Sequence, residues 1–407
     1  MTERKRIFVW SLYDFANTSY SIVVVTFLYA VYFKKVVAQG QPIGDLYWSI
    51  GMSSAMLITA FLSPILGAIS DYSAGKKKFL LFFTILCIVF TSLLYFVQTG
   101  NIFWGLIFFI FANIGFEAGL TFYDAFLPEL TEPKNFGRVS GYGFAMGYFG
   151  SLCILFITLP FIQNEMLRET FPIAALFYLI FSLPLFLFLK EEKKPKVKGI
   201  NFVKLGLGRV YNTLTHLKDY KNLATFILAY FFFIEGVNTI IYFSGNYAST
   251  TIGFTEEDLL IFFIIVQTTA LIGSILFGIL ADKIGLKITL MISLGIWLCT
   301  TFMAYISVEK LTFYIVGTLA GFALGSSQST SRSLMSKLTP YEKRTEFFGF
   351  YSFFGKSSAI LGPMIFGLVS YGTGSQRIAI LTIAFFFIVG MLILTQVKEP
   401  PAVEKPT

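Results

Sequence analysis

Several ionisable side chains lie inside long apolar stretches of this sequence, where segments that span a membrane rarely carry charge. The acids are Asp14, Glu117, Asp124 and Glu235, and the bases are Arg332 and Lys356. An ion near the bilayer centre costs at least ~2.5–3.5 kcal/mol, so such residues usually face a protein interior or a watery path. The acids outnumber the bases, and a buried carboxylate without a counter-charge takes up a proton or meets a cation. These residue types therefore predict proton or cation handling.

The spacing of these residues places them on polar stripes along helices. Asp14, Asn17 and Ser21 stand at i, i+3 and i+7, which is one face of a helix. Three further stripes have spacing of the same kind: Glu117, Thr121 and Asp124; Glu235, Asn238, Thr239 and Tyr242; and Gln328, Ser331 and Arg332. Polar stripes on four helices do not suit contact with lipid, so a water-filled path is the better interpretation.

Each of these ionisable residues also has a structural explanation. Asp124 and Arg332 fall near the predicted ends of spans, where a gate contact or a plain helix-end salt bridge explains them better than contact with a substrate. Asp14 fits a functional acid and a structural acid paired with either base equally well. Glu117 and Glu235 lie deeper in their spans, which favours a function for both. No histidine lies in an apolar stretch, so any proton coupling has to run through carboxylates.

The composition is that of an integral membrane protein. Of the 407 residues, 56% are hydrophobic and 13% are charged, whereas soluble domains carry roughly 25% charged residues. The net charge of +8 reflects lysines gathered on one face of a membrane, so we expect a lipid bilayer and not a nucleic acid as partner. The cysteines lie in apolar stretches at spacings that suit neither a disulfide nor a metal, and we predict no metal site and no cofactor.

Apolar stretches of about 20 residues are long enough to cross a ~30 Å hydrocarbon core. We predict an all-α integral membrane fold with twelve such spans, arranged as two pseudo-symmetric six-helix bundles. The polar segment 253–260 is expected to be a loop before the eighth span. The approximate bounds of the spans are 8–33, 46–69, 79–98, 102–126, 139–162, 171–189, 223–245, 259–281, 287–306, 311–336, 347–370 and 375–396.

The distribution of basic residues predicts the orientation of the chain. Most lysines and arginines fall in the termini and in the loops on one side of the predicted spans. Positively charged loops stay in the cytoplasm, so both termini are expected to be cytoplasmic. The loops on the other side hold only Lys34, Lys35, Arg168, Lys310 and Arg377.

The longest connection divides the chain into domains. Residues 190–222 are basic and carry apolar side chains at helical spacing, which predicts a cytoplasmic amphipathic helix at the membrane interface. This linker tethers an N-terminal half, 1–189, to a C-terminal half, 223–396, and a cytoplasmic tail follows at 397–407. A phospholipid-binding regulatory role is the alternative explanation for the linker.

Matching segments indicate that the two halves are duplicates. GAISDYSAGKKK at 67–78 and GILADKIGLK at 278–287 occupy the same place in each half, and Asp14-x-x-Asn17 matches Glu235-x-x-Asn238. Glycines and a Leu-Thr pair link the fourth and fifth spans to the tenth and eleventh in the same way. In the loops, we expect the Gly to allow close helix packing and the Asp to lie at the positive amino end of the next helix. Parallel repeats are typical of large transporters that bind substrate near the midplane.

GILADKIGLK resembles the cytoplasmic loop signature of the major facilitator superfamily, and the resemblance covers nearly the whole chain. It implies that Asp282, and Asp71 in the other copy, belong to a cytoplasmic gate that forms and breaks during alternating access. The first copy departs from the signature, because Tyr72 replaces the usual basic residue and one extra residue precedes Gly75. The gate role implied for Asp71 is therefore weaker than that implied for Asp282.

Five further segments belong together: WSLYDFANTSY at 10–20, FYDAFLPEL at 122–130, RVSGYGFAMGY at 138–148, SRSLMSKLTP at 331–340 and EFFGFYSFFGK at 346–356. They resemble a narrower branch, the vacuole-effluxer-like transporters, which comprises autophagy-associated vacuolar amino-acid effluxers and their bacterial relatives. The compact loops fit the bacterial form, which implies a place in the bacterial inner membrane. The resemblance implies a secondary transporter, which in fungal members exports amino acids.

These observations predict a monomeric secondary transporter, not an enzyme, that works by alternating access, is coupled to protons or another ion, and exports amino acids or similar small polar solutes. The alternative is a transporter of a drug, a sugar or an organic acid. A channel is opposed by the duplicated gate loops, and an embedded enzyme by the lack of a catalytic motif. The substrate or proton-path candidates are Asp14, Asn17, Glu117, Thr121, Glu235, Asn238, Gln328 and Lys356, and the gate candidates are Asp71, Asp124, Arg138, Asp282 and Arg332.

Overall fold

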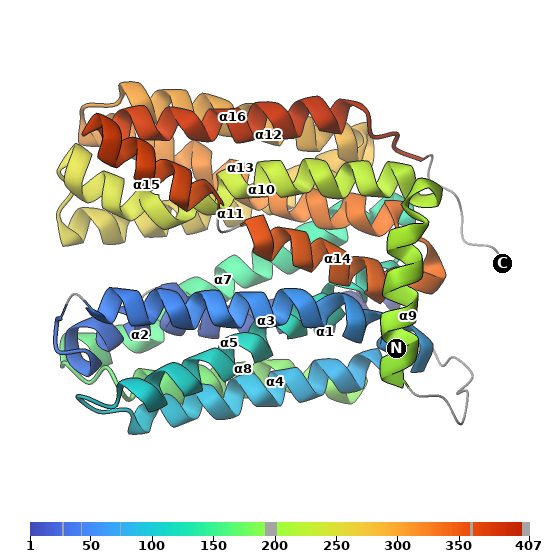
Figure 1. Ribbon diagram of the computed structural model, residues 1–407, viewed down its shortest axis with the longest axis horizontal. Helices are drawn as coiled ribbons and strands as arrows, with labels where there is room; N and C mark the ends of the chain where they lie inside the picture. The colour runs from blue at the N-terminus through green and yellow to red at the C-terminus, as the bar shows by residue number, and fades with distance from the viewer. Residues whose placement is uncertain (27, 42, 74, 192–201, 359–360, 401–407) are drawn as a thin grey trace. The chain divides into compact units, whose positions relative to one another are not determined.

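The computed structural model describes residues 1–26, 28–41, 43–73, 75–191, 202–358 and 361–400, and this part of the chain consists of helices joined by short loops (Figure 1). The helices are α1 Glu3–Tyr20, α2 Leu28–Tyr32, α3 Ile43–Ser73, α4 Lys76–Leu93, α5 Ile102–Asp124, α6 Leu127–Leu130, α7 Phe136–Gln163, α8 Thr170–Phe188, α9 Phe202–Thr215, α10 Lys221–Tyr247, α11 Glu256–Ile284, α12 Leu286–Ile306, α13 Lys310–Leu338, α14 Arg344–Ser357, α15 Leu361–Thr373 and α16 Gln376–Thr395.

The helices cover every predicted span. Within the described ranges, ten helical stretches are long and apolar enough to cross a membrane. The tenth predicted span is α13, which is 29 residues long but rich in serine and carries Arg332, so its hydropathy is low. The eleventh is divided into α14 and α15, of 14 and 13 residues. The prediction of an all-α, multi-span membrane fold is confirmed.

The polar segment before the eighth span differs from its prediction. It was expected to be a loop, yet α11 already begins at Glu256. Thr255 and Asp258 form a capping box there, in which the Thr255 side chain accepts from the Asp258 amide and the Asp258 carboxylate accepts from the Thr255 amide. Such a box satisfies the amides that a first turn leaves unpaired, which is why acidic residues suit the start of this helix.

The described chain forms two compact units. Unit 1 contains Met1–Leu130, Met146–Val210 and Glu342–Gly349, and unit 2 contains Thr131–Ala145, Tyr211–Tyr341 and Phe350–Thr407. The amino ends of α7 and α14 therefore each belong to a different unit from the rest of their helix. The sequence halves did not anticipate this exchange. The linker helix is present as α9, while linker residues 192–201 and tail residues 401–407 lie outside the described part.

Aromatic stacking and hydroxyl pairs fill the interior of unit 1. Trp10 of α1 stacks on Tyr123 of α5 with ring centroids 4.7 Å apart. The hydroxyl of the neighbouring Tyr13 is buried and bonds both Thr84, at 2.7 Å, and Tyr178, at 2.8 Å. Buried hydroxyls cost free energy unless they are paired, so this cluster fixes α1 against α4 and α8.

In unit 1, charged residues join α4 to α8 at both ends of the helix pair. Beyond α8, the Glu191 carboxylate accepts from the amides of Lys76, at 2.8 Å, and Lys77, at 3.2 Å. The Lys77 ammonium in turn donates to the Leu189 carbonyl at 2.6 Å. At the other end, Arg168 donates to the Tyr95 carbonyl at 2.8 Å. The acid Glu191 lies at the amino end of α4 and the base Arg168 lies beyond its carboxyl end. Both placements are favourable with respect to the helix dipole.

Unit 2 repeats this arrangement between α12 and α16, which lie side by side in Figure 1. Glu399 accepts from the amides of Leu286, at 3.2 Å, and Lys287, at 2.9 Å. The Lys287 ammonium donates to carbonyls that end α16 and follow it. Arg377 donates to the Tyr305 carbonyl at 3.0 Å, as Arg168 does to Tyr95. The duplication inferred from the sequence therefore extends to these contacts.

Candidate functional site

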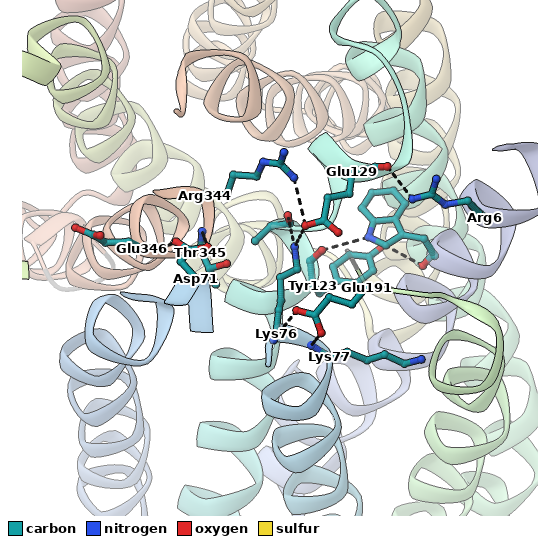
Figure 2. A network of polar contacts seen from close by, with 12 residues as sticks. Arg6, Asp71, Lys76, Lys77, Tyr123, Glu129, Glu191, Arg344, Thr345 and Glu346 are labelled. Carbon is teal, nitrogen blue, oxygen red and sulfur yellow. Dashed lines mark hydrogen bonds and ion pairs between the residues drawn. The ribbon is translucent and has the colours of Figure 1, made fainter. Parts of the chain in front are cut away.

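In unit 1, the carboxylate of Asp71 binds the first turn of α14. Asp71 lies near the end of α3, and it accepts hydrogen bonds from the amides of Thr345, at 3.1 Å, and Glu346, at 2.8 Å (Figure 2). A helix leaves these amides without internal partners and carries partial positive charge at this end. The buried carboxylate therefore holds the start of α14 against the end of α3.

In unit 2, Asp282 binds the first turn of α7 in the same way. It lies near the end of α11 and accepts from the amide of Gly137 at 2.8 Å. Arg138 adds its amide, at 3.2 Å, and its Nε, at 2.6 Å. The Asp282 side chain is almost fully buried, whereas that of Arg138 is 43% exposed. The two predicted gate residues Arg138 and Asp282 are thus in direct contact.

Glycines allow these helix ends to come close enough for the caps. A Cβ atom on Gly67 would collide with the Thr345 carbonyl, and one on Gly278 would lie 2.7 Å from the Gly137 carbonyl oxygen. The packing role predicted for the loop glycines therefore agrees with the structure, and it serves the contact between α3 and α14 and that between α11 and α7.

The prediction of which helix the loop aspartates bind was wrong. Each Asp was expected to lie at the amino end of the next helix, but Asp71 instead caps a turn 274 residues away. The amino ends of the next helices, α4 and α12, are bound by Glu191 and Glu399. Sequence reasoning missed both glutamates. Their shared place just after the last span of each half was the signal that could have found them.

A buried ion cluster lies beside the Asp71 cap. Glu129 of α6 pairs with Lys76 and with Arg344, whose Nη1 is 3.2 Å away, as Figure 2 shows. All three side chains are buried. The Lys76 ammonium also donates to the Ala125 carbonyl at 3.1 Å, and Arg6 donates to the Glu129 carbonyl at 2.8 Å. None of these residues was a site candidate, because in the sequence they fall in separate loops.

Arg332 of α13 reinforces the start of α7 within unit 2. Its guanidinium donates to the hydroxyl and the carbonyl of Ser140, both at 2.9 Å, and lies over the ring of Phe144 at 4.1 Å. One residue on, the Ser333 hydroxyl donates to the Phe136 carbonyl at 2.9 Å. The arginine is buried. Arg332, a predicted gate residue, thus contacts the helix that Asp282 caps.

The path candidates of unit 1 lie on α1 and α5. Asn17 donates to the Asp14 carboxylate at 3.3 Å, and both are buried. Thr121 donates to the Ser63 hydroxyl at 3.3 Å, which joins α5 to α3. The path candidate Glu117 and the gate candidate Asp124, which also lie on α5, are half-buried.

The path candidates of unit 2 lie on α10, α13 and α14. Glu235 is fully buried, and its carboxylate accepts from the Gly362 amide at the start of α15. Lys356 donates to the Ser352 hydroxyl one turn earlier in α14. Asn238 and Gln328 are half-buried. The suggested pairing of Asp14 with one of the two bases stays a prediction.

The sequence matches the family described as "Vacuole effluxer Atg22 like" over residues 47–136 and 131–404. It is 34% identical to the uncharacterized MFS-type transporter YxiO of Bacillus subtilis, over 96% of this chain and 94% of that protein. It is also 24% identical to autophagy-related protein 22 of Kluyveromyces lactis, over 62% of this chain and 56% of that longer protein. Both resemblances noted in the sequence are confirmed.

Solved structures of the major facilitator superfamily share the fold. The proton:xylose symporter XylE aligns over 99% of this chain and 97% of its own, with a TM-score of 0.76 at 15% identity. The human organic anion transporter MFSD10 aligns over 97% and 100%, with a TM-score of 0.73 at 16% identity. At such low identity the likeness concerns the fold alone.

Proposed function

The chain belongs to the vacuole effluxer Atg22-like family and is a multi-pass membrane transporter of the major facilitator fold, and we propose that it exports amino acids or similar small polar solutes by proton-coupled alternating access. The coarse assignment to transport, and not to enzyme catalysis, follows from family and fold. The class of solute, the coupling to protons and the direction of transport are what we propose.

The observation that carries the proposed mechanism is the duplicated aspartate cap. Asp71 holds the start of α14, and Asp282 holds the start of α7, through a few hydrogen bonds each. Such contacts contribute about 1.5–3 kcal/mol apiece when a charged group takes part. Contacts of this size are strong enough to favour one state and weak enough to break in every transport cycle. We propose that both caps are cytoplasmic gates.

The charges of the candidate path support an amino-acid substrate. An amino acid brings an ammonium group for an acid such as Asp14 or Glu117 and a carboxylate for a base such as Lys356. The family description as effluxers, and the amino-acid export implied by the resemblance to fungal members, support the class and the direction. We propose that the full set of path candidates from Asp14 to Lys356 serves substrate and proton.

The same proposal includes location and assembly. We propose that the protein is a monomer. We also propose that it lies in a bacterial inner membrane, because the relative YxiO is bacterial and the loops are compact. Both termini are proposed to be cytoplasmic, because the basic loops and termini gather on one side of the spans.

The test is transport by the purified full-length protein in liposomes. An imposed pH gradient should drive accumulation of one or more labelled amino acids, and an ionophore that collapses the gradient should abolish it. The double variant Asp71→Asn with Asp282→Asn, at equal protein content, should lose most of this accumulation. Selective uptake of a sugar or an organic anion would replace the substrate class. Equal uptake with and without the gradient would overturn proton coupling.

A further inference from the structure

A buried acid in unit 2 makes a contact outside the proposed gates. Glu235 lies in α10, and its side chain is 0% exposed. Its Oε1 accepts a hydrogen bond from the backbone amide of Gly362 in the first turn of α15. Its Oε2 is buried and has no hydrogen-bond partner among the residues that the structure describes. One carboxyl group therefore joins α10 to the start of α15 and uses only one of its two oxygens.

The charged side chains on the helices around α10 are engaged elsewhere. Among the described residues, no lysine or arginine pairs with Glu235, and the Gly362 amide is the hydrogen-bond donor to its carboxyl group. The other contacts are Lys310 to Asp258, Arg332 to Ser140, Lys337 to Glu399, Lys356 to Ser352, and Arg377 to the Tyr305 carbonyl.

The tyrosines of the same region have contacts of their own. Tyr230 stacks on Tyr351, Tyr247 donates to the Ala304 carbonyl, and Tyr314 donates to Asp258. The hydroxyl nearest along the helix, that of Thr239, donates to the backbone carbonyl of Glu235 at 2.8 Å and not to its carboxylate. Within the described part of the chain, neither an ionised nor a neutral polar side chain therefore supplies the second oxygen of Glu235 with a donor.

The environment of Glu235 favours a neutral carboxylic acid over a carboxylate. An ion buried in a membrane span without a counter-charge costs far more free energy than the neutral acid. A neutral acid keeps Oε1 as the acceptor for Gly362 and carries its proton on Oε2. Oε2 is the oxygen that no donor approaches, so the unsatisfied position and the position of the proton coincide.

We propose that Glu235 is the proton-binding group of this transporter and that it holds its proton in the conformation described here. The inference rests on the proposed proton coupling and assigns it to one residue. Release of the proton requires a proton acceptor such as water at Oε2, and therefore requires the contact between α10 and α15 to open. Separation of α15 from Glu235 and loss of the proton are then one event, which is what coupling requires.

Infrared spectroscopy of the purified full-length protein tests the assignment. Near neutral pH, the wild type should show the carbonyl stretch of a protonated, buried carboxylic acid, and Glu235→Gln should lose that band. The control is Glu399→Gln, which removes a carboxylate that is paired with Lys337 and should leave the band unchanged. A band of unchanged intensity in Glu235→Gln would overturn the proposal.

A second variant guards against misfolding. Glutamine keeps a carbonyl acceptor for Gly362, so Glu235→Gln should melt close to the wild type. In Gly362→Ala the new Cβ would collide with the Thr239 hydroxyl oxygen and lie 2.7 Å from Oε1, so both side chains have to move. The contact is disturbed while the acid remains, and the band should shift and not disappear. A band at the wild-type position in Gly362→Ala would contradict the assignment to this contact.

Transport assays separate this inference from the proposed function. Glu235→Gln should lose at least tenfold in pH-driven accumulation. If the wild type shows pH-driven accumulation while the band persists in Glu235→Gln, the assignment fails and the transport proposal stands. If the band is lost in Glu235→Gln while no solute moves in the wild type, the proton site stands and the transport proposal fails.

Discussion

Asp282 binds Arg138 twice, through the backbone amide at 3.2 Å and through the guanidinium Nε at 2.6 Å. At the corresponding place in unit 1, Asp71 binds the amide of Glu346, whose side chain is an acid and cannot donate. The Glu346 carboxylate instead lies 4.0 Å from Arg209 of α9. The two caps thus share their backbone geometry, and the residue whose amide is capped carries a base in α7, Arg138, and an acid in α14, Glu346.

Asp282→Asn should be more harmful than the loss of a backbone cap alone. It replaces one acceptor oxygen by an amide group that faces a backbone donor, which should cost about 1–3 kcal/mol of stability. It also loses the ion pair with Arg138. Thermal melting in detergent, together with pH-driven accumulation in liposomes, measures both effects. Arg138→Gln should have a smaller effect than Asp282→Asn, because water screens a half-exposed guanidinium. An equal or larger effect of Arg138→Gln would contradict this account.

Gly67→Ala should separate α14 from α3 and weaken the Asp71 cap. The new Cβ collides with the backbone carbonyl of Thr345, which cannot rotate away as a side chain could. Transport should fall at least tenfold. The matched control is Gly295→Ala in α12, where a Cβ meets nothing within 4 Å, and alanine should there gain about 0.5–1 kcal/mol of stability. If both variants transported like the wild type, close packing at Gly67 would not be needed for the gate.

Glu129→Gln should be among the most destabilising conservative substitutions in unit 1. It leaves the buried charges of Lys76 and Arg344 without their shared carboxylate, and breaking a buried ion pair in this way costs about 3–5 kcal/mol. The control is Glu132→Gln, because the exposed pair of Glu132 and Lys134 should contribute little. Melting temperature is the measurement. Similar melting temperatures for the two variants would mean that the cluster adds little to stability.

Glu399→Gln should destabilise the protein more than Glu191→Gln. Both glutamates accept two amides at the start of a helix, and loss of such a cap typically costs about 1 kcal/mol. Glu399 additionally pairs with Lys337 at 2.7 Å, with both side chains largely buried. Chemical unfolding of the two variants under the same conditions checks the order. The reverse order would show that the pair with Lys337 contributes less than the backbone contacts.

Local patterns predicted the helices well because span length and apolar content are properties of short windows. Every predicted span overlaps a helix, and the repeated loops placed Asp71 and Asp282 at equivalent positions before any geometry was known. The eleventh span was predicted as one run, 347–370, but it is divided between α14 and α15. Apolar content alone does not distinguish one long helix from two short ones.

The contacts of the site could not be read from the sequence in the same way. The partner of Asp71 lies 274 residues away, and no local rule selects the first turn of α14 over that of α4. Glu129, Lys76 and Arg344 likewise come from three separate segments. Glu191 and Glu399 are an intermediate case, since their equivalent positions after the last span of each half form a repeat that an internal comparison can detect.

The exchange of helix ends between the units bears on how the protein is made. Unit 1 includes Glu342–Gly349, although the rest of it ends at Val210. Domains generally fold in order as the chain leaves the ribosome, but unit 1 lacks part of itself until residue 349 has been synthesised and inserted. Its Asp71, Lys76 and Glu129 must therefore wait for Arg344 and its neighbours until most of unit 2, up to Tyr341, has been synthesised. Completion of unit 1 is thus a late step of biogenesis.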